Sequence, residues 1–236
     1  MSMTPPGSWL DRPLASAFLR FNLLPNSLAH ESQQAAADAI SGTPGTFPGS
    51  GHTIVLEPRR LLRHASAQLL RSLSENELYV QGLSDPALPV FMAPTQCFER
   101  LTIFCGLVVL SLPIRRVIVR EERERLRAEL SQEELAFARL RAPLHWADDT
   151  AGACLMSQGA VREQALRLGQ VLLVHAADAA SPPVACRARL RLPVMREADI
   201  LNLPATLREG ATALMLSRSI LQELDPEWLT LFPDFL

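Results

Sequence analysis

Prolines divide this chain into short segments and limit the length of every regular element that it can form. The 236 residues include 18 prolines, and a proline inside a helix removes a backbone hydrogen bond and clashes with the preceding turn. Pro25, Pro58, Pro113, Pro193 and Pro226 each stand where a helical or extended pattern starts or stops. We therefore expect many short elements rather than a few long ones.

Helical periodicity recurs between these prolines. Residues at spacings of four, three and four indicate amphipathic helices along two stretches: Leu62, Ser66, Leu69 and Leu73, then Val161, Ala165, Leu168 and Leu172. Ser131 and Glu134 match a capping box, which predicts a helix start. Further helices are predicted within 15–40, broken at Pro25, and over 97–113, 114–130 and 204–224.

One segment, 184–194, alternates apolar and polar residues with a period of two, which predicts a half-buried strand. Its three arginines, Arg187, Arg189 and Arg191, would then share one face, and residues 53–56 are the candidate partner strand. The fold class expected is mainly α: one compact domain over 1–236 of about eight helices with a small β element. Residues 1–14 are expected to be a flexible N-terminus, and 41–52 a Gly/Pro-rich loop.

Composition and charge narrow the classes of function. Apolar residues make up 48% of the chain and the net charge is −2, which disfavours nucleic acid as a partner. The longest apolar run, 101–114, is shorter than the roughly 20 residues of a membrane-spanning helix. The first twenty residues lack the apolar core of a signal peptide. The four cysteines have no metal-ligand or disulfide spacing, so we expect free thiols in a reducing cytosol.

No catalytic set or cofactor site emerges from the motifs. All 23 basic residues are arginine, which excludes lysine chemistry. His145, Asp148 and Asp149 are close in sequence but match no metal-ligand motif, and the aspartates can cap the following helix. Ser50 lies in a glycine-rich turn before His52, yet the sequence lacks a nucleophile elbow. We expect neither a metal nor a cofactor.

Two kinds of surface are candidates for binding a partner. Arg187, Arg189 and Arg191 would form an edge for carboxylates or, alternatively, a solvated face that discourages aggregation. Arg115 and Arg116 follow the apolar helix, and they either bind a partner or interact with the dipole at its C-terminus. An apolar patch is expected at the aromatic tail, with Trp228, Phe232 and Phe235.

Several stretches, in order along about 16–232, resemble the SctK family of type III secretion proteins, which includes YscK, PscK, OrgA and HrpD-like members. FNLLPNSLAH at 21–30 resembles the family's Phe-containing helix broken by a proline and followed by a histidine. GLVVLSLPIRRVI at 106–118 resembles its Gly-Leu-Val-Leu helix leading into Ile-Arg-Arg. PLHW at 143–146 and LRLP at 190–193 resemble a Pro-to-His-Trp turn and a strand before the last helix.

The resemblance implies a non-enzymatic cytoplasmic adaptor of the injectisome sorting platform. Such an adaptor links pods of an SctQ-type protein to the cytoplasmic domain of the SctD-type inner-membrane ring, and an SctL-type stator is a further candidate partner. It would work at the cytoplasmic face of the inner membrane without inserting into it. The alternatives are a small cytosolic hydrolase that uses Ser50 and a solitary regulatory binding domain.

Overall fold

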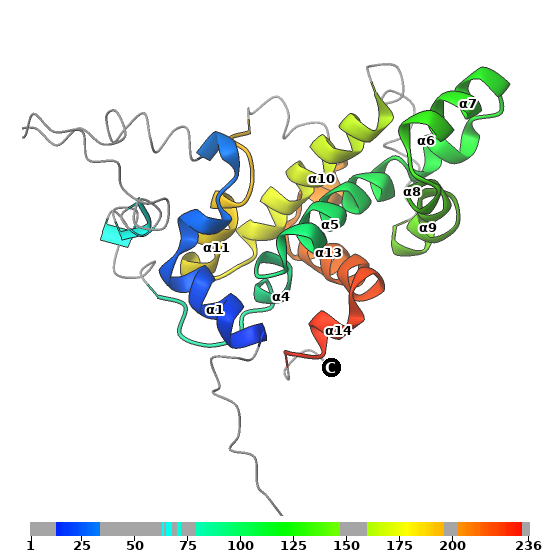
Figure 1. The fold of residues 1–236 in the computed structure, drawn as a ribbon. Helices are drawn as coiled ribbons and strands as arrows, with labels where there is room; N and C mark the ends of the chain where they lie inside the picture. The colour runs from blue at the N-terminus through cyan, green and yellow to red at the C-terminus, as the bar shows by residue number, and fades with distance from the viewer. Residues whose placement is uncertain are drawn as a thin grey trace, which may run out of the picture. The chain divides into compact units, whose positions relative to one another are not determined.

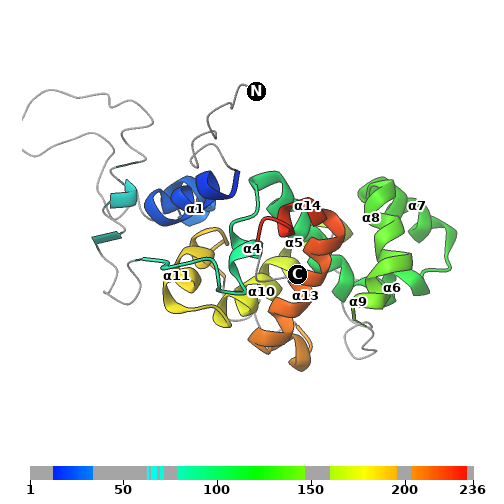
Figure 2. The same cartoon turned by 90° about the horizontal axis from the view of Figure 1, so that it is seen from below.

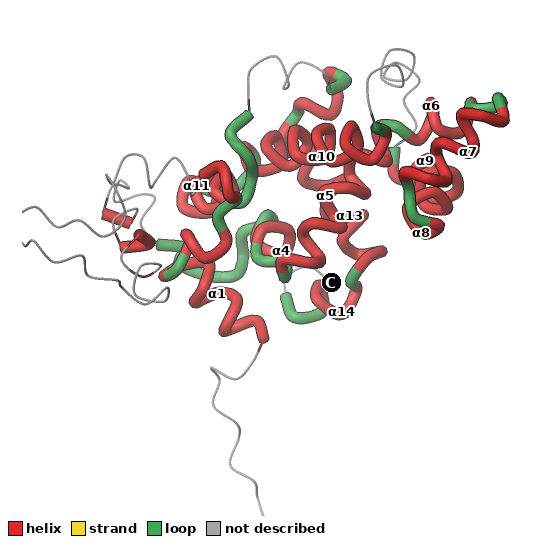
Figure 3. The backbone as a smooth tube through the Cα atoms, turned by 45° about the horizontal axis from the view of Figure 1, so that its top comes forward, coloured by secondary structure: helices red, strands yellow, loops and turns green. Residues whose placement is uncertain are grey.

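A computed structural model of the chain describes residues 13–33, 63, 65–67, 70–71, 79–146, 160–195 and 203–232. In this part of the chain the regular elements are all helical, as Figure 3 shows, which confirms the mainly α class. Residues 53–56, Ser50, His52, His64, Asp148, Asp149, Cys154 and Phe235 lie outside the described residues, as do 1–12 and the 41–52 loop.

The chain divides into two compact units. Unit 1 comprises residues 1–84 and 181–194, and unit 2 comprises 85–180 and 195–236. The expectation of one domain over 1–236 stays a prediction.

Unit 1 contains α1 (Pro13–Leu23), the 3-10 helix η2 (Pro25–Leu28) and α11 (Pro182–Leu190) (Figure 1). The break at Pro25 confirms the interruption predicted there. The Asn22 side chain joins α1 to the extended segment at Val80: its Nδ2 donates to the Val80 carbonyl at 3.1 Å, and the Val80 N–H donates to its Oδ1 at 3.0 Å. The His30 N–H donates to the Leu190 carbonyl at 2.7 Å, which joins the chain after η2 to α11.

The strand predicted at 184–194 is wrong, because α11 occupies Pro182–Leu190. Two prolines in the first turn favour a helix start, since their fixed φ suits that position and their missing N–H groups are not needed there. Buried Val184, Ala188 and Leu192 are spaced by four, and that spacing belongs to one helical face as well as to every second step of an alternating pattern. The alternating apolar residues that predicted a strand therefore include residues spaced by four, as on one face of a helix.

Unit 2 is built around α5 (Thr95–Val109) and α10 (Val161–Asp178), with α13 (Gly210–Leu224) packed against both (Figures 1 and 2). Shorter elements complete it: α4 (Leu88–Phe91), α6 (Ser111–Arg116), α7 (Arg120–Glu129), α8 (Gln132–Ala136), the π-helix η4 (Phe137–Arg141), α9 (Ala142–His145), η6 (Ala205–Arg208) and α14 (Pro226–Leu229). The inward positions predicted for α10, Val161, Ala165, Leu168 and Leu172, are buried, which confirms that pattern.

Glycines allow α5 and α10 to cross at backbone contact. A Cβ added to Gly106 would lie 1.7 Å from the Ala165 carbonyl oxygen, and one added to Gly169 would lie 1.7 Å from the Thr102 carbonyl oxygen. Both distances are far below van der Waals contact, and in both cases the added Cβ would collide with a backbone atom, which cannot move aside as a side chain can. Neither glycine can therefore be replaced unless the two helices separate.

Two prolines account for irregular turns in unit 2. Pro113 follows a break at Leu110, so its ring lies in the first turn of a new helix, α6, rather than inside α5. Pro143 lies just after η4, where the Ala142 N–H donates to the Phe137 carbonyl in the wider π pattern. The widened turn avoids the clash that a proline makes with a regular preceding turn.

Replacing Gly106 with alanine is expected to lower the free energy of unfolding by about 3 kcal/mol or more, the upper end for overpacking, because the obstructing atom is a backbone oxygen. Urea unfolding followed by circular dichroism measures the change. Gly82→Ala is the control: a Cβ there meets nothing within 4 Å, so its stability should be unchanged or slightly higher. Equal stability of the two variants would contradict the close crossing.

Candidate functional site

The three arginines of 187–191 do not share an exposed face, so that prediction is wrong. Arg187 and Arg191 are buried, with 1% and 6% of their surface exposed, whereas Arg189 is exposed. On a helix, residues four apart lie on one face and the residue between them lies on the other. Only Arg189 remains a candidate for binding a partner at the surface of unit 1.

Arg187 caps the C-terminal end of α1. Its Nε donates to the Phe21 carbonyl at 3.1 Å and its Nη2 to the Asn22 carbonyl at 3.3 Å. These carbonyls lie in the last turn of α1, where no N–H of the same helix reaches them and where the dipole favours a cation. Burial lowers the pKa of Arg187, partly offset by Cys186 and Tyr79. The residue therefore stabilises unit 1 from inside.

Arg187→Ala is expected to lower the free energy of unfolding by about 3 kcal/mol, because it leaves buried carbonyls without donors and opens a cavity. Chemical denaturation measures this. The matched control is Arg189→Ala, which lies two residues away on the exposed side and should change stability by less than about 0.5 kcal/mol. A similar small effect for both variants would contradict the capping role.

Trp228 and Phe232 are core residues rather than an exposed patch, which corrects the second predicted surface. Trp228 is 6% exposed and Phe232 is 0% exposed. Their rings meet edge to face with centroids 5.4 Å apart, and the indole Nε1 donates to the Pro89 carbonyl at 2.8 Å. Trp228 of α14, together with Phe232, thus packs against α4.

Arg115 and Arg116 are exposed in the last turn of α6, as a surface role requires. The next residues are also at the surface: Ile118 is 78% exposed and Val119 is 53% exposed. Residues 115–120 run from the last turn of α6 to the first residue of α7 and are here called the α6–α7 corner. They combine cationic and aliphatic side chains. Figures 1 and 2 show α6 and α7 at the end of unit 2 opposite α4 and α14.

Between the two helices the backbone of the corner is extended, and it is held by α7. Val117 has φ −68° and ψ 109°, and Val119 has φ −63° and ψ 135°. Arg123 closes the corner, because its N–H donates to the Val119 carbonyl at 3.1 Å and its Nε donates to the Val117 carbonyl at 3.5 Å. The exposed side chains thus project from a defined turn.

Carboxylates fix α7 and α8 to the start of α10. Glu129 accepts from the Val161 N–H at 2.5 Å, at the N-terminus of α10, and from Arg125 at 2.7 Å. Burial raises the pKa of Glu129, but these hydrogen bonds and the charge of Arg125 outweigh it, so the net pKa is lowered. Glu134 forms the predicted capping box with Ser131 and also accepts from Arg162 at 3.3 Å. The corner is thereby anchored to the core of unit 2.

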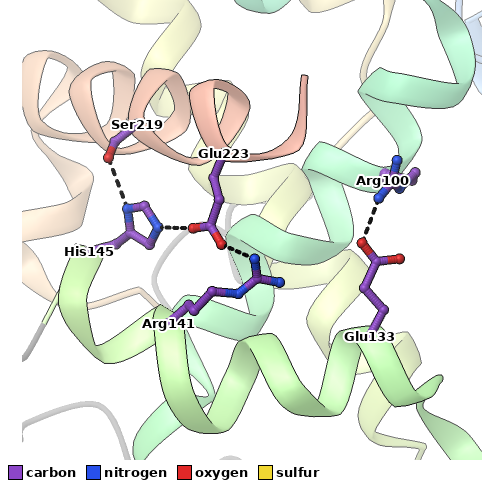
Figure 4. Close-up of polar contacts among 6 residues, drawn as sticks. All are labelled: Arg100, Glu133, Arg141, His145, Ser219 and Glu223. Carbon is purple, nitrogen blue, oxygen red and sulfur yellow. Dashed lines mark hydrogen bonds and ion pairs between the residues drawn. The ribbon is translucent and has the colours of Figure 1, made fainter. Parts of the chain in front are cut away.

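A second polar cluster joins α9 to α13 (Figure 4). His145 lies between two groups of α13: its Nδ1 is 2.9 Å from the Ser219 hydroxyl and its Nε2 is 2.8 Å from Glu223 Oε2. Arg141, one turn before His145, forms an ion pair with Glu223 at 2.5 Å. No sequence pattern predicted this cluster. The spacing of Ser219 and Glu223 places them on one face, but nothing local connects that face to His145.

Serine, histidine and glutamate are the residue types of a nucleophile, a base and an orienting acid. Ser219 lies inside α13, so the backbone N–H groups around it are bonded within the helix and cannot stabilise an oxyanion there. Glu223 is shared with Arg141. The cluster therefore connects α9 to α13.

The thiol of Cys105 lies in the core of unit 2. Burial raises its pKa to about 12, and the Ser217 hydroxyl, 3.9 Å from its Sγ, lowers the value only in part. Cys97 and Cys186 are partly exposed, and none of the three described cysteines is in a disulfide.

Cys105 should react with iodoacetamide at pH 8 at least about a hundredfold more slowly in the folded chain than in urea, because the reactive thiolate is scarce and shielded. Peptide mass spectrometry after timed alkylation measures each site. Cys97 is the internal control and should be labelled in the native chain. Rapid native labelling of Cys105 would contradict its burial.

Within the described ranges, no group of three or more His, Cys, Asp or Glu side chains is arranged to hold a metal ion. No helix of the described part is long and apolar enough to cross a membrane. The chain matches no protein-family model, no curated protein and no solved structure.

Proposed function

We propose that this chain is a non-enzymatic adaptor of the SctK type in a type III secretion sorting platform. It links pods of an SctQ-type protein to the cytoplasmic domain of an SctD-type inner-membrane ring. An SctL-type stator is a further partner. The adaptor works at the cytoplasmic face of the inner membrane and does not insert into the bilayer.

The observation that carries this proposal is the exposed pair Arg115 and Arg116 at the end of α6. In the resemblance to the SctK family, this pair falls where the family has Ile-Arg-Arg after an apolar helix. The apolar helix before it is the buried α5. A charged pair on the surface, one short helix beyond a core helix, suits a docking protein because the core fixes the position of the charges.

The other fragments of the resemblance also fall on defined junctions of the fold. The Phe-to-His stretch at 21–30 spans the end of α1, the break at Pro25 and η2. PLHW at 143–146 forms most of α9 and contains His145. LRLP at 190–193 is the exit from α11, rather than a strand. The fragments occur in the same order as in the SctK family, and their positions in the fold support the proposal.

Affinity isolation of the tagged full chain from cells that are assembling injectisomes tests the proposal. We expect the pod protein and the inner-ring protein to be recovered together. Because the chain has no lysine, amine-directed cross-linkers have no side-chain target on it, so a photo-reactive amino acid at an exposed position is the better choice. Ser50→Ala is the matched variant for the hydrolase alternative, and recovery of both partners should be unchanged.

Recovery of neither protein by the wild-type chain would contradict the adaptor proposal. Loss of secretion in Ser50→Ala, with the fold and the recovered partners intact, would favour the hydrolase. Recovery of one partner without the other would contradict the bridge between pod and ring.

A further inference from the structure

The α6–α7 corner exposes two aliphatic side chains that the fold itself does not use. Ile118 and Val119 are 78% and 53% exposed, whereas Ile114 before them and Leu126 after them are at most 1% exposed. Single exposed aliphatic residues are ordinary at protein surfaces. Two in succession on one exposed turn are less so, and with charged residues on both sides of them in the chain they form a small apolar centre with a charged rim.

The rim of this centre is cationic on the α6 side. Between Pro113 and Arg120 the sequence has three arginines and no acidic residue. Arg120 forms an ion pair with Glu124 at 2.9 Å, but its side chain is 87% exposed. Exposed pairs of this kind contribute little and exchange readily for another carboxylate. All three arginines are exposed, so carboxylates of a partner can reach their guanidinium groups and accept bidentate hydrogen bonds from them.

The shape of the corner is already formed in the isolated chain. The extended backbone at Val117 and Val119 is fixed by Arg123 and by the helices on both sides. A ligand that docks there does not have to order the segment first, which removes part of the entropic cost of binding.

We propose that the α6–α7 corner docks an acidic segment of a partner protein, in which carboxylates flank one large apolar side chain. The apolar side chain would cover Ile118 and Val119, and the carboxylates would meet Arg115 and Arg116. This inference rests on the proposed function, because it takes the corner to be one of the adaptor's docking surfaces.

The acidic residues that follow favour a protein over a membrane. Glu121 and Glu122 are exposed in the first turn of α7, next to the apolar pair. A flat anionic bilayer that meets the arginines would also approach these carboxylates, and their repulsion opposes binding. A protein segment can be shaped to meet the arginines and avoid the glutamates, so complementarity of charge selects it.

An array of short peptides tests the inference. Each peptide carries one leucine, isoleucine, phenylalanine or tryptophan among aspartates and glutamates at varied spacing, and a second array has lysine at every acidic position. The wild-type chain should bind members of the acidic array at low ionic strength and lose binding as salt is added. Vesicles of phosphatidylglycerol and phosphatidylethanolamine are tested in parallel.

Variants separate the two components of the surface. Arg115→Glu with Arg116→Glu, and Ile118→Ser with Val119→Ser, should each weaken binding by about tenfold or more. The first of these should instead bind the lysine array. Arg189→Glu, an exposed arginine of unit 1, is the control and should bind as the wild type does. Circular dichroism verifies that each variant is folded.

Three results would overturn the inference: equal peptide binding by all variants, no binding to the acidic array, or binding to the vesicles in preference to peptides. The same charge-reversal variant in the affinity isolation distinguishes the two proposals. If it recovers pod and ring proteins as well as the wild type does, the corner is not a docking surface and the adaptor stands. If the wild type recovers neither while the array shows charge-dependent binding, the adaptor fails and the binding chemistry of the corner stands.

Discussion

Helices α5 and α10 cross at a distance that only glycine permits, and this crossing positions most of the other helices of unit 2. Gly106 and Gly169 each lie against a carbonyl oxygen of the opposite helix. Because α5 leads into α6 and α10 receives Glu129 from α7 at its first N–H, both helices also hold the charged end of the unit. The position of Arg115 and Arg116 is thus decided by a contact between two backbones in the core.

Ionisable side chains in this protein repeatedly complete the ends of helices. Glu129 accepts from the start of α10, Asp225 accepts from the Trp228 N–H at the start of α14, and Arg187 donates to the end of α1. Each satisfies backbone groups that a helix leaves without partners. A charge in the sequence is therefore weak evidence for a binding surface until its exposure is known. Arg187 and Arg189 are two residues apart, yet Arg187 is buried at a helix end and Arg189 is exposed.

Sequence patterns predicted the elements well where the signal was local. The break at Pro25, the capping box of Ser131 and Glu134, and the buried stripe of α10 all depend on residues within a few positions of one another, and the structure confirms them. Features that depend on distant segments were missed or misassigned. The alternation in α11 fitted a strand as well as a helix, and only packing on Val184, Ala188 and Leu192 decides between them. His145 and Glu223 are 78 positions apart, so no local pattern joins them.

Helix α7 is ten residues long, and Leu126 is its one buried side chain, so burial does not constrain the other nine. Its other charges can change over evolutionary time, or by design, at little cost in stability, provided that Arg123, Arg125 and Glu129 keep the contacts that hold the corner and α10. With the docking proposed at the α6–α7 corner, α7 is a region in which changes of charge alter the choice of partner. If charges are exchanged between this chain and a partner, the two variants would bind each other and not the unchanged proteins. Two such assemblies could then operate side by side in one cell.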